Sequence, residues 1–305
     1  MVRAIQQIET DLKALEQKVS AIAQQIEEAY EDYIQLLGET LQNQLTFSVY
    51  QICTQEYPDA FLKLSLSQQQ ALQKQIRDLG QKAQANFQLG GEILQQIEWS
   101  DEQATALEEM LSEEEDNPET SDQKDSNSNF NLETLQALLQ SGQSPSDENS
   151  PENVKVWCYL QAEAITMILE NVSSQANTVL QQAGVLPQEL PKEMIDAAIQ
   201  SEGAGTISNR APGVLHLMLE LERKDQQDQS HSSDDENEVM QLSIVRLRVG
   251  ELEFSAPNLN TKRRTLRTLE QQLQQLDEQY RKLNKERAIA QAELAWRSSW
   301  HNDEQ

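Results

Sequence analysis

Two apolar stripes, one near each end of the chain, constrain the fold of this sequence more than any other feature. In the C-terminal stretch, about residues 260–300, apolar or long side chains recur in alternating steps of three and four residues. The members of this stripe are Leu266, Leu269, Leu273, Leu276, Tyr280, Leu283, Arg287, Ala290 and Leu294. A seven-residue period of this kind places one face of a helix against a partner helix, as in a coiled coil.

The first helix, predicted from about Val2 to Cys53, carries a second stripe of the same period. Its members are Ile5, Ile8, Leu12, Leu15, Val19, Ile22, Ile26, Ala29, Tyr33 and Leu36. After Gly38 the steps become mostly four residues, which favours packing inside a globular bundle. The two stripes are similar in length, so they allow antiparallel pairing of the chain ends, within one chain or between two. Self-association of either stripe and capture of another protein's helix are the alternatives, and the flanking charges do not select among them.

Further helices are predicted between the two stripes. Ser67 and Gln70 have the spacing of a capping box, which predicts a helix from about Gln68. An amphipathic helix is predicted over residues 153–183. The last helix is expected to follow Pro257, with an asparagine as its N-cap, because residues before proline avoid helical angles.

Two segments fit both a strand and a helix. Residues 214–222 alternate apolar and polar side chains, and residues 240–254 do so in part, which would make a two-stranded hairpin. Residues 240–254 also have helical spacing and lead into the final helix, and an isolated hairpin is only marginally stable. We therefore favour helix for both segments.

Acidic residues dominate the chain and gather in two segments. The net charge is −27, from 51 acidic and 24 basic residues. Residues 112–152 and 224–238 are rich in Asp, Glu, Ser and Asn and poor in apolar side chains, so both are predicted to be disordered. Within the first, a leucine cluster over 132–139 is interpreted either as a short helix that docks on a partner or as a satellite helix of its own domain.

These patterns predict an all-α fold, with helical bundle regions, N- and C-terminal coiled-coil helices and disordered acidic linkers. The expected organisation is an N-terminal helical region (1–111), an acidic linker (112–152), a second helical region (153–223), an acidic loop (224–238) and a C-terminal helix or coiled coil (239–305).

Positive charge is concentrated near the C-terminus. From Met240 to Trp300 there are eleven basic and seven acidic residues, in a chain whose net charge is −27. The densest patch consists of Lys262, Arg263, Arg264 and Arg267. One interpretation is that this patch binds an acidic partner, nucleic acid or a membrane surface. The interpretation we favour is that it contacts acidic parts of the same chain.

Three other side chains of the C-terminal helix are candidates for a role. Trp296 and Trp300 are four residues apart on one helical face and are interpreted either as anchors in a partner's groove or as packing against the N-terminal helix. Arg287 occupies a stripe position, where a polar residue can fix the register of a coiled coil or mark the fraying of its end.

Patterns typical of catalysis, cofactor binding or metal binding are missing from the sequence. The three histidines are far apart, and no His/Cys spacing resembles a metal site. No phosphate-binding loop, dinucleotide-binding loop or nucleophile motif occurs. Cys53 and Cys158 are expected to be buried free thiols of a cytoplasmic protein. We expect no enzymatic activity, no cofactor, no signal peptide and no transmembrane segment.

The glutamine-rich helices and two short segments suggest a source. The segments RVGELEFSAP, from Arg248 to Pro257, and AELAWRSSW, from Ala292 to Trp300, resemble uncharacterised helical and coiled-coil proteins of cyanobacteria. This resemblance implies no activity and no site residues.

The stripes and composition together predict a non-enzymatic adaptor or scaffold that assembles proteins, or copies of itself, through coiled-coil helices. The alternative is a protein that binds nucleic acid or an anionic surface through the basic patch. An acidic chain repels nucleic acid, which favours the first prediction.

Overall fold

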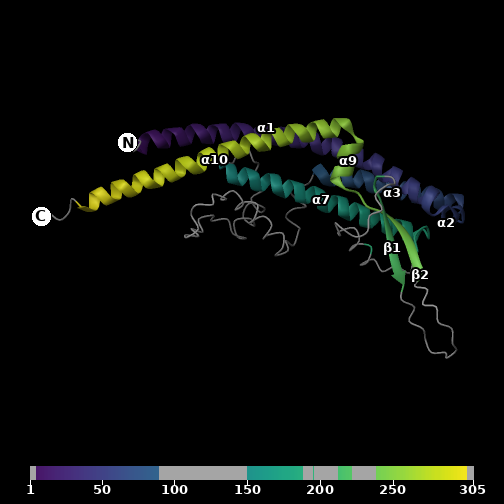
Figure 1. Ribbon diagram of the computed structural model, residues 1–305. Coiled ribbons are helices and arrows are strands. Elements are labelled where there is room, and N and C mark those ends of the chain that lie inside the picture. Colours follow the sequence, from purple (N-terminus) through teal and green to yellow (C-terminus); the bar gives the residue numbers. More distant parts are fainter. Residues whose placement is uncertain (1–4, 89–149, 188–194, 196–211, 222–237, 301–305) are drawn as a thin grey trace, which may run out of the picture. The chain divides into compact units, whose positions relative to one another are not determined.

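The computed structural model describes residues 5–88, 150–187, 195, 212–221 and 238–300 (Figure 1). Their elements are α1 (Ile5–Gln51), the π-helical turn η1 (Ile52–Glu56), α2 (Pro58–Leu62), α3 (Leu66–Gln88), α7 (Pro151–Gln182), β1 (Val214–Leu221), β2 (Glu238–Val245), α9 (Val249–Ser255) and α10 (Pro257–Trp300). These residues are essentially all-α with one small two-stranded sheet, so the predicted fold class is confirmed. The predicted acidic linkers lie almost wholly outside the described residues, as does the leucine cluster over 132–139.

The described residues belong to two compact units. Unit 1 contains residues 5–33, 150–164 and 261–300. Unit 2 contains residues 34–88, 165–187, 195, 212–221 and 238–260. Helices α1, α7 and α10 each contribute residues to both units, so each unit combines stretches that are far apart in the sequence.

In unit 1 the first turns of α1 lie beside residues 280–290 of α10 (Figure 1). One hydrophobic cluster joins the two helices and consists of Ile5, Ile8, Leu12, Tyr280, Leu283 and Ala290. Farther along the pair, Lys262 of α10 forms an ion pair with Asp32 of α1. The two helices are therefore antiparallel, and the predicted stripes cover each other within one chain.

The first part of α7 joins this pair in unit 1. The Trp157 ring packs edge-to-face on Tyr30 of α1, with 5.1 Å between the ring centroids. Lys155 Nζ lies 2.8 Å from Asp277 Oδ2 of α10. Unit 1 is thus a bundle of three helical segments, each in contact with the other two.

The buried stripe of α1 does not keep the predicted seven-residue period. Ile22, Ala29 and Leu36 are half-buried, and in each case the next residue along the chain is buried instead. From Ile8 to Ile52 the buried stripe takes twelve steps, or about 3.7 residues a step. A straight α-helix has 3.6 residues a turn and a heptad coiled coil has 3.5, so the buried stripe of α1 does not follow the coiled-coil period. Beyond Val19 the predicted stripe is therefore wrong at Ile22, Ala29 and Leu36, whereas Ile26 and Tyr33 are buried as predicted.

The stripe of α10 is buried as predicted over its first half. Its four leucines from Leu266 to Leu276 are buried, and Tyr280 and Leu283 are half-buried. Arg287 is exposed, which excludes it as a buried register-fixing residue and agrees with the loosening of the helix pair. The buried polar residue of this face is Asp277, which pairs with Lys155 and, at 3.2 Å, with Arg281.

In unit 2 the later part of α1 packs closely against α3. Gln42 Nε2 donates a hydrogen bond of 2.7 Å to Gln84 Oε1. A Cβ atom added to Gly38 would lie 2.7 Å from Gln84 Cγ, so a side chain at Gly38 would clash with α3. The close approach of the two helices explains a glycine in the middle of α1, where it otherwise destabilises the helix.

Helix α3 begins two residues earlier than predicted. The capping box is formed by Ser65 and Gln68, because Gln68 Oε1 accepts the Ser65 N–H at 2.9 Å and Ser65 Oγ accepts the Gln68 N–H at 3.4 Å. The predicted pair Ser67 and Gln70 has the same spacing but lies inside the helix. Similarly, α10 begins at Pro257 itself, since proline suits the first helical position.

The helix predicted for residues 214–222 and for the start of 240–254 is wrong. Strands β1 and β2 pair antiparallel from Val214↔Val245 to Leu221↔Glu238. The later part of the second segment is helical as predicted, in α9. The predicted alternation is real in β1, where Leu215 and Leu217 are buried and Val214 and His216 are half-buried. Strand β2 does not alternate, because every residue from Leu242 to Val245 is buried.

Hydrogen bonds from distant helices explain why this hairpin is stable. The Asn177 side chain of α7 donates to the Val245 carbonyl at 2.9 Å and accepts the Val245 N–H at 2.8 Å. At the turn before β1, Gln44 Nε2 of α1 donates to the Pro212 carbonyl at 2.6 Å. These side chains satisfy backbone groups that a two-stranded sheet leaves unpaired.

We expect Asn177→Ala to lower the free energy of unfolding by about 2–4 kcal/mol, because two buried backbone groups would lose their partners. Urea denaturation followed by circular dichroism measures this change. Asn171→Ala, on an exposed position of the same helix, is the matched control and should change it by less than about 0.5 kcal/mol. Equal effects of the two substitutions would contradict the role given to Asn177.

A second pair of substitutions tests the helix pair of unit 1. Leu273→Ala should cost about 2–5 kcal/mol, since this side chain is only 1% exposed. Leu294→Ala, the same change on the same helix, should cost less than about 0.5 kcal/mol, since Leu294 is 63% exposed. Similar losses in urea denaturation would show that Leu294 is covered in solution.

Candidate functional site

The basic patch at the start of α10 divides into two inward and two outward residues. Lys262 pairs with Asp32, and Arg263 Nη1 lies 3.5 Å from Glu270 Oε1. These two residues therefore contact acidic groups of the same chain. Arg264 and Arg267 are exposed, and neither forms an ion pair with another described residue.

An aromatic cluster lies next to the inward residues of the patch. Tyr30 is buried, and its hydroxyl donates a hydrogen bond of 3.4 Å to the Cys158 carbonyl. Burial raises the pKa of Tyr30 well above its usual value, and the nearby Arg263 guanidinium lowers it in part. Burial also raises the pKa of the Cys158 thiol to about 12. Both groups stay neutral near pH 7, so this cluster is core rather than a reactive centre.

Large apolar side chains are exposed on the last turns of α10. Ile289, Leu294 and Trp296 are 50%, 63% and 66% exposed. The last buried residue of the stripe is Ala290, and Figure 1 shows α10 continuing past the start of α1. Trp296 therefore does not pack into a core against α1, whereas the side chain of Trp300 lies outside the described set. With 3.6 residues a turn, Ile289 and Trp296 lie on one face of α10, and Leu294 lies on the face of the buried stripe. We call the exposed surface of these last turns, which includes all three side chains, the distal α10 surface.

Sequence reasoning missed a polar cluster in unit 2 that joins η1 to the hairpin. Ser243 Oγ of β2 donates to Glu56 Oε2 at 2.8 Å and lies 2.8 Å from His216 Nδ1 of β1. The Ser243 N–H donates to the Tyr57 hydroxyl at 2.9 Å. Glu56 and Tyr57 are 186 residues or more from Ser243, and neither has a local sequence signal that could have predicted the contact.

The arrangement of this cluster differs from that of a serine hydrolase. In a hydrolase triad the two ring nitrogens of the histidine face the acid and the serine separately. Here His216 Nδ1 faces both, since it lies 2.8 Å from Ser243 Oγ and 3.6 Å from Glu56 Oε2. Ser243 is only 2% exposed, so no substrate reaches its hydroxyl. His216 Nε2 is buried and has no hydrogen-bond partner among the described residues. The geometry is that of a structural clamp that holds the hairpin on η1.

Two further kinds of site are not found among the described residues. They contain no group of three or more His, Cys, Asp or Glu side chains placed to hold a metal ion. None of the helices in the described ranges combines the length and the apolar content needed to cross a bilayer. Comparisons with protein-family models, with curated proteins and with solved structures found no match to this chain.

We expect Ser243→Ala to lower the free energy of unfolding by about 1–3 kcal/mol, because it removes the hydroxyl that bridges Glu56 and His216. Gln241→Ala is the control on the same strand, since its side chain is exposed. Thermal unfolding of the two variants tests the clamp, and an unchanged midpoint for Ser243→Ala would show that it contributes nothing to stability.

Proposed function

We propose that this chain is a non-enzymatic, cytoplasmic adaptor that binds a protein partner through the distal α10 surface. The observation that carries the proposal is the exposure of Ile289, Leu294 and Trp296 on a helix that is otherwise paired. Exposed apolar clusters on folded proteins commonly mark interaction sites, and tryptophan often supplies much of the binding energy.

The charges around this surface favour a particular kind of partner. Lys282, Lys285 and Arg287 are exposed on the turns just before it, and none forms an ion pair with another described residue. A helix with an apolar face and acidic flanks would match both the apolar side chains and these cations. A second copy of α10 would bring like charges together, so we favour a different protein as the partner.

The adaptor proposal differs from the assembly predicted from the sequence in one respect. The N-terminal stripe and the C-terminal stripe as far as Ala290 pack on each other in unit 1, which favours the residues beyond Ala290 as the binding surface. Among the described residues of unit 1, the large apolar side chains that remain exposed are Ile289, Leu294 and Trp296.

A photo-crosslinking residue in place of Ile289 tests the proposal in cells that produce the protein. The chain should crosslink to an acidic amphipathic helix of one partner. The double variant Leu294→Glu, Trp296→Glu should reduce the yield of crosslinked partner at least about tenfold, because the two substitutions place charge in the apolar contact. The control is the double variant Gln291→Glu, Ala295→Glu, which adds the same charge at exposed positions of the same helix. Its yield of crosslinked partner should equal that of the wild type.

Three results would contradict this proposal. The double variant could capture the same partner as well as the wild type does. Light scattering could show a homodimer that the double variant abolishes, which would make a second copy the partner. The chain could also remain a monomer that crosslinks to nothing.

The outward residues of the basic patch support a second candidate, binding to an anionic surface or to nucleic acid. Arg264 and Arg267 are one turn apart, exposed and without ion pairs among the described residues. Binding of vesicles that contain anionic lipid, or of duplex DNA, should then weaken with salt and with Arg264→Glu plus Arg267→Glu. No binding at low salt would exclude this candidate.

A further inference from the structure

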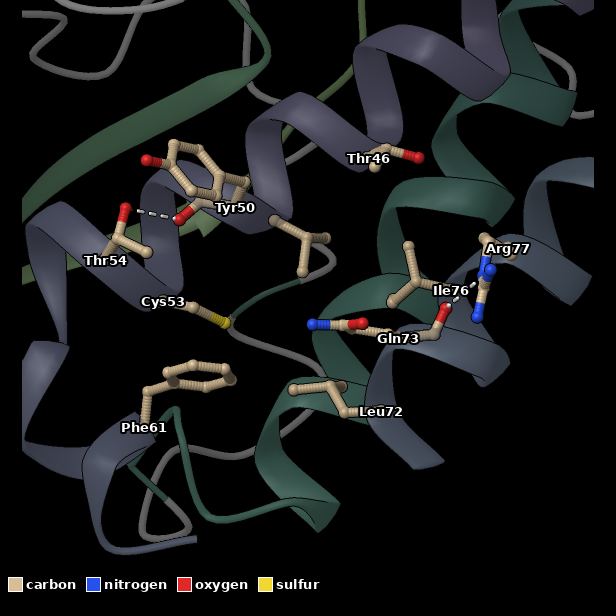
Figure 2. Close-up of a pocket in the computed structure, with 10 residues that line it drawn as sticks. Thr46, Tyr50, Cys53, Thr54, Phe61, Leu72, Gln73, Ile76 and Arg77 are labelled. Atoms are coloured by element: carbon tan, nitrogen blue, oxygen red, sulfur yellow. Dashed lines mark hydrogen bonds between the residues drawn. The ribbon is translucent and has the colours of Figure 1, made fainter. Parts of the chain in front are cut away.

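Unit 2 contains a pocket that none of the patterns in the sequence predicted. The pocket has a volume of about 440 Å³ and lies among α1, η1, α2 and α3. Figure 2 shows the Cys53 sulfur directed into the space between the Phe61 ring and the Gln73 side chain. Pockets of roughly 300–1,000 Å³ with apolar walls and a few polar groups are typical of small-molecule sites.

The walls of the pocket are mainly apolar. Val49 and Cys53 come from α1 and η1, Phe61 from α2, and Leu72 and Ile76 from α3. Burial raises the pKa of the Cys53 thiol to about 11, so this wall carries no charge at neutral pH. An occupant must therefore present an apolar body to these side chains.

One cation stands at the rim of the pocket. Arg77 is the only charged residue among those that line it, and its Nε donates to the Gln73 carbonyl of the same helix at 3.3 Å. Arg77 forms no ion pair with a described residue. Its guanidinium therefore retains donors for an anion, and it is a favourable partner for a carboxylate.

The π-helical turn η1 shapes this pocket. The Tyr57 N–H donates to the Ile52 carbonyl at 2.9 Å, five residues back, which makes the turn wider than an α-helical one. Cys53 and Thr54 of η1 line the pocket, while Glu56 of the same turn holds Ser243 of the hairpin. Such turns often occur at functional sites.

We infer that this pocket binds an aliphatic monocarboxylate, with its chain against Cys53 and Ile76 and its carboxylate on Arg77. The site is separate from the distal α10 surface and does not depend on the proposed adaptor function.

Titration of the full chain with decanoate, followed by calorimetry, tests this site. Decanoate should bind with one-to-one stoichiometry. Thr46→Trp, on an exposed rim position, should weaken binding at least about tenfold by filling the entrance. Asn43→Trp, exposed on the same helix but outside the pocket, is the matched control and should bind as the wild type does.

The role of Arg77 has its own comparison. Arg77→Gln should weaken decanoate binding about fivefold and leave the binding of decan-1-ol unchanged, because only the carboxylate contacts the guanidinium. Lys74 is an exposed cation of the same helix and does not line the pocket. Lys74→Gln should therefore leave the affinity for both ligands unchanged.

The thiols supply a readout that does not depend on the heat of binding. Decanoate should slow the alkylation of Cys53 by iodoacetamide at mildly alkaline pH and leave that of Cys158, in unit 1, unchanged. Failure of decanoate to bind, equal binding by Thr46→Trp, or unprotected Cys53 would overturn the inference. If the wild type bound decan-1-ol as tightly as it binds decanoate, the assignment of Arg77 would be overturned.

Discussion

The antiparallel contact between α1 and α10 is the interaction on which unit 1 depends. Each helix has a polar outer face and one apolar stripe, and neither stripe could remain exposed to water along its length at low cost. Their mutual burial, completed by the first turns of α7, creates the core around Ile8, Leu12 and Ala290. Because α10 continues past the start of α1, the contact that forms the bundle also leaves Leu294 and Trp296 exposed.

The sequence predicts well those parts of the fold that depend on local periodicity. The long helices at both ends, the helix ending before Gly184 and the buried leucines from Leu266 to Leu276 all follow from apolar spacing along a single segment. The error in the N-terminal stripe has a simple cause. A helix with 3.6 residues a turn drifts against a seven-residue template. The drift was hidden because the predicted residues Ile22 and Ala29 are apolar, as are Ala23 and Tyr30, the residues that are buried instead.

The rest of the fold depends on contacts that no local pattern contains. Asn177 stabilises the hairpin by hydrogen bonding to Val245, 68 residues later in the sequence. No local pattern shows this contact, so the low stability expected of an isolated hairpin led to the wrong prediction of helix. Ser65 with Gln68 and Ser67 with Gln70 have the same capping-box spacing in the sequence, and the structure forms the first. The pocket arises where η1 widens the end of α1, and the sequence of that turn shows no signal for this change. Within the basic patch, the sequence could not tell which cations point inward.

The central claim is that the two terminal stripes cover each other within one chain, and crosslinking at the Asp32–Lys262 ion pair tests it most directly. Cysteines replace these two residues, together or singly, in a chain in which Cys53 and Cys158 are replaced by serine. A short bis-maleimide should link the doubly substituted chain to itself at low protein concentration and should not join the two singly substituted chains when they are mixed. Efficient crosslinking between the mixed chains, with no internal link in the double variant, would contradict the account.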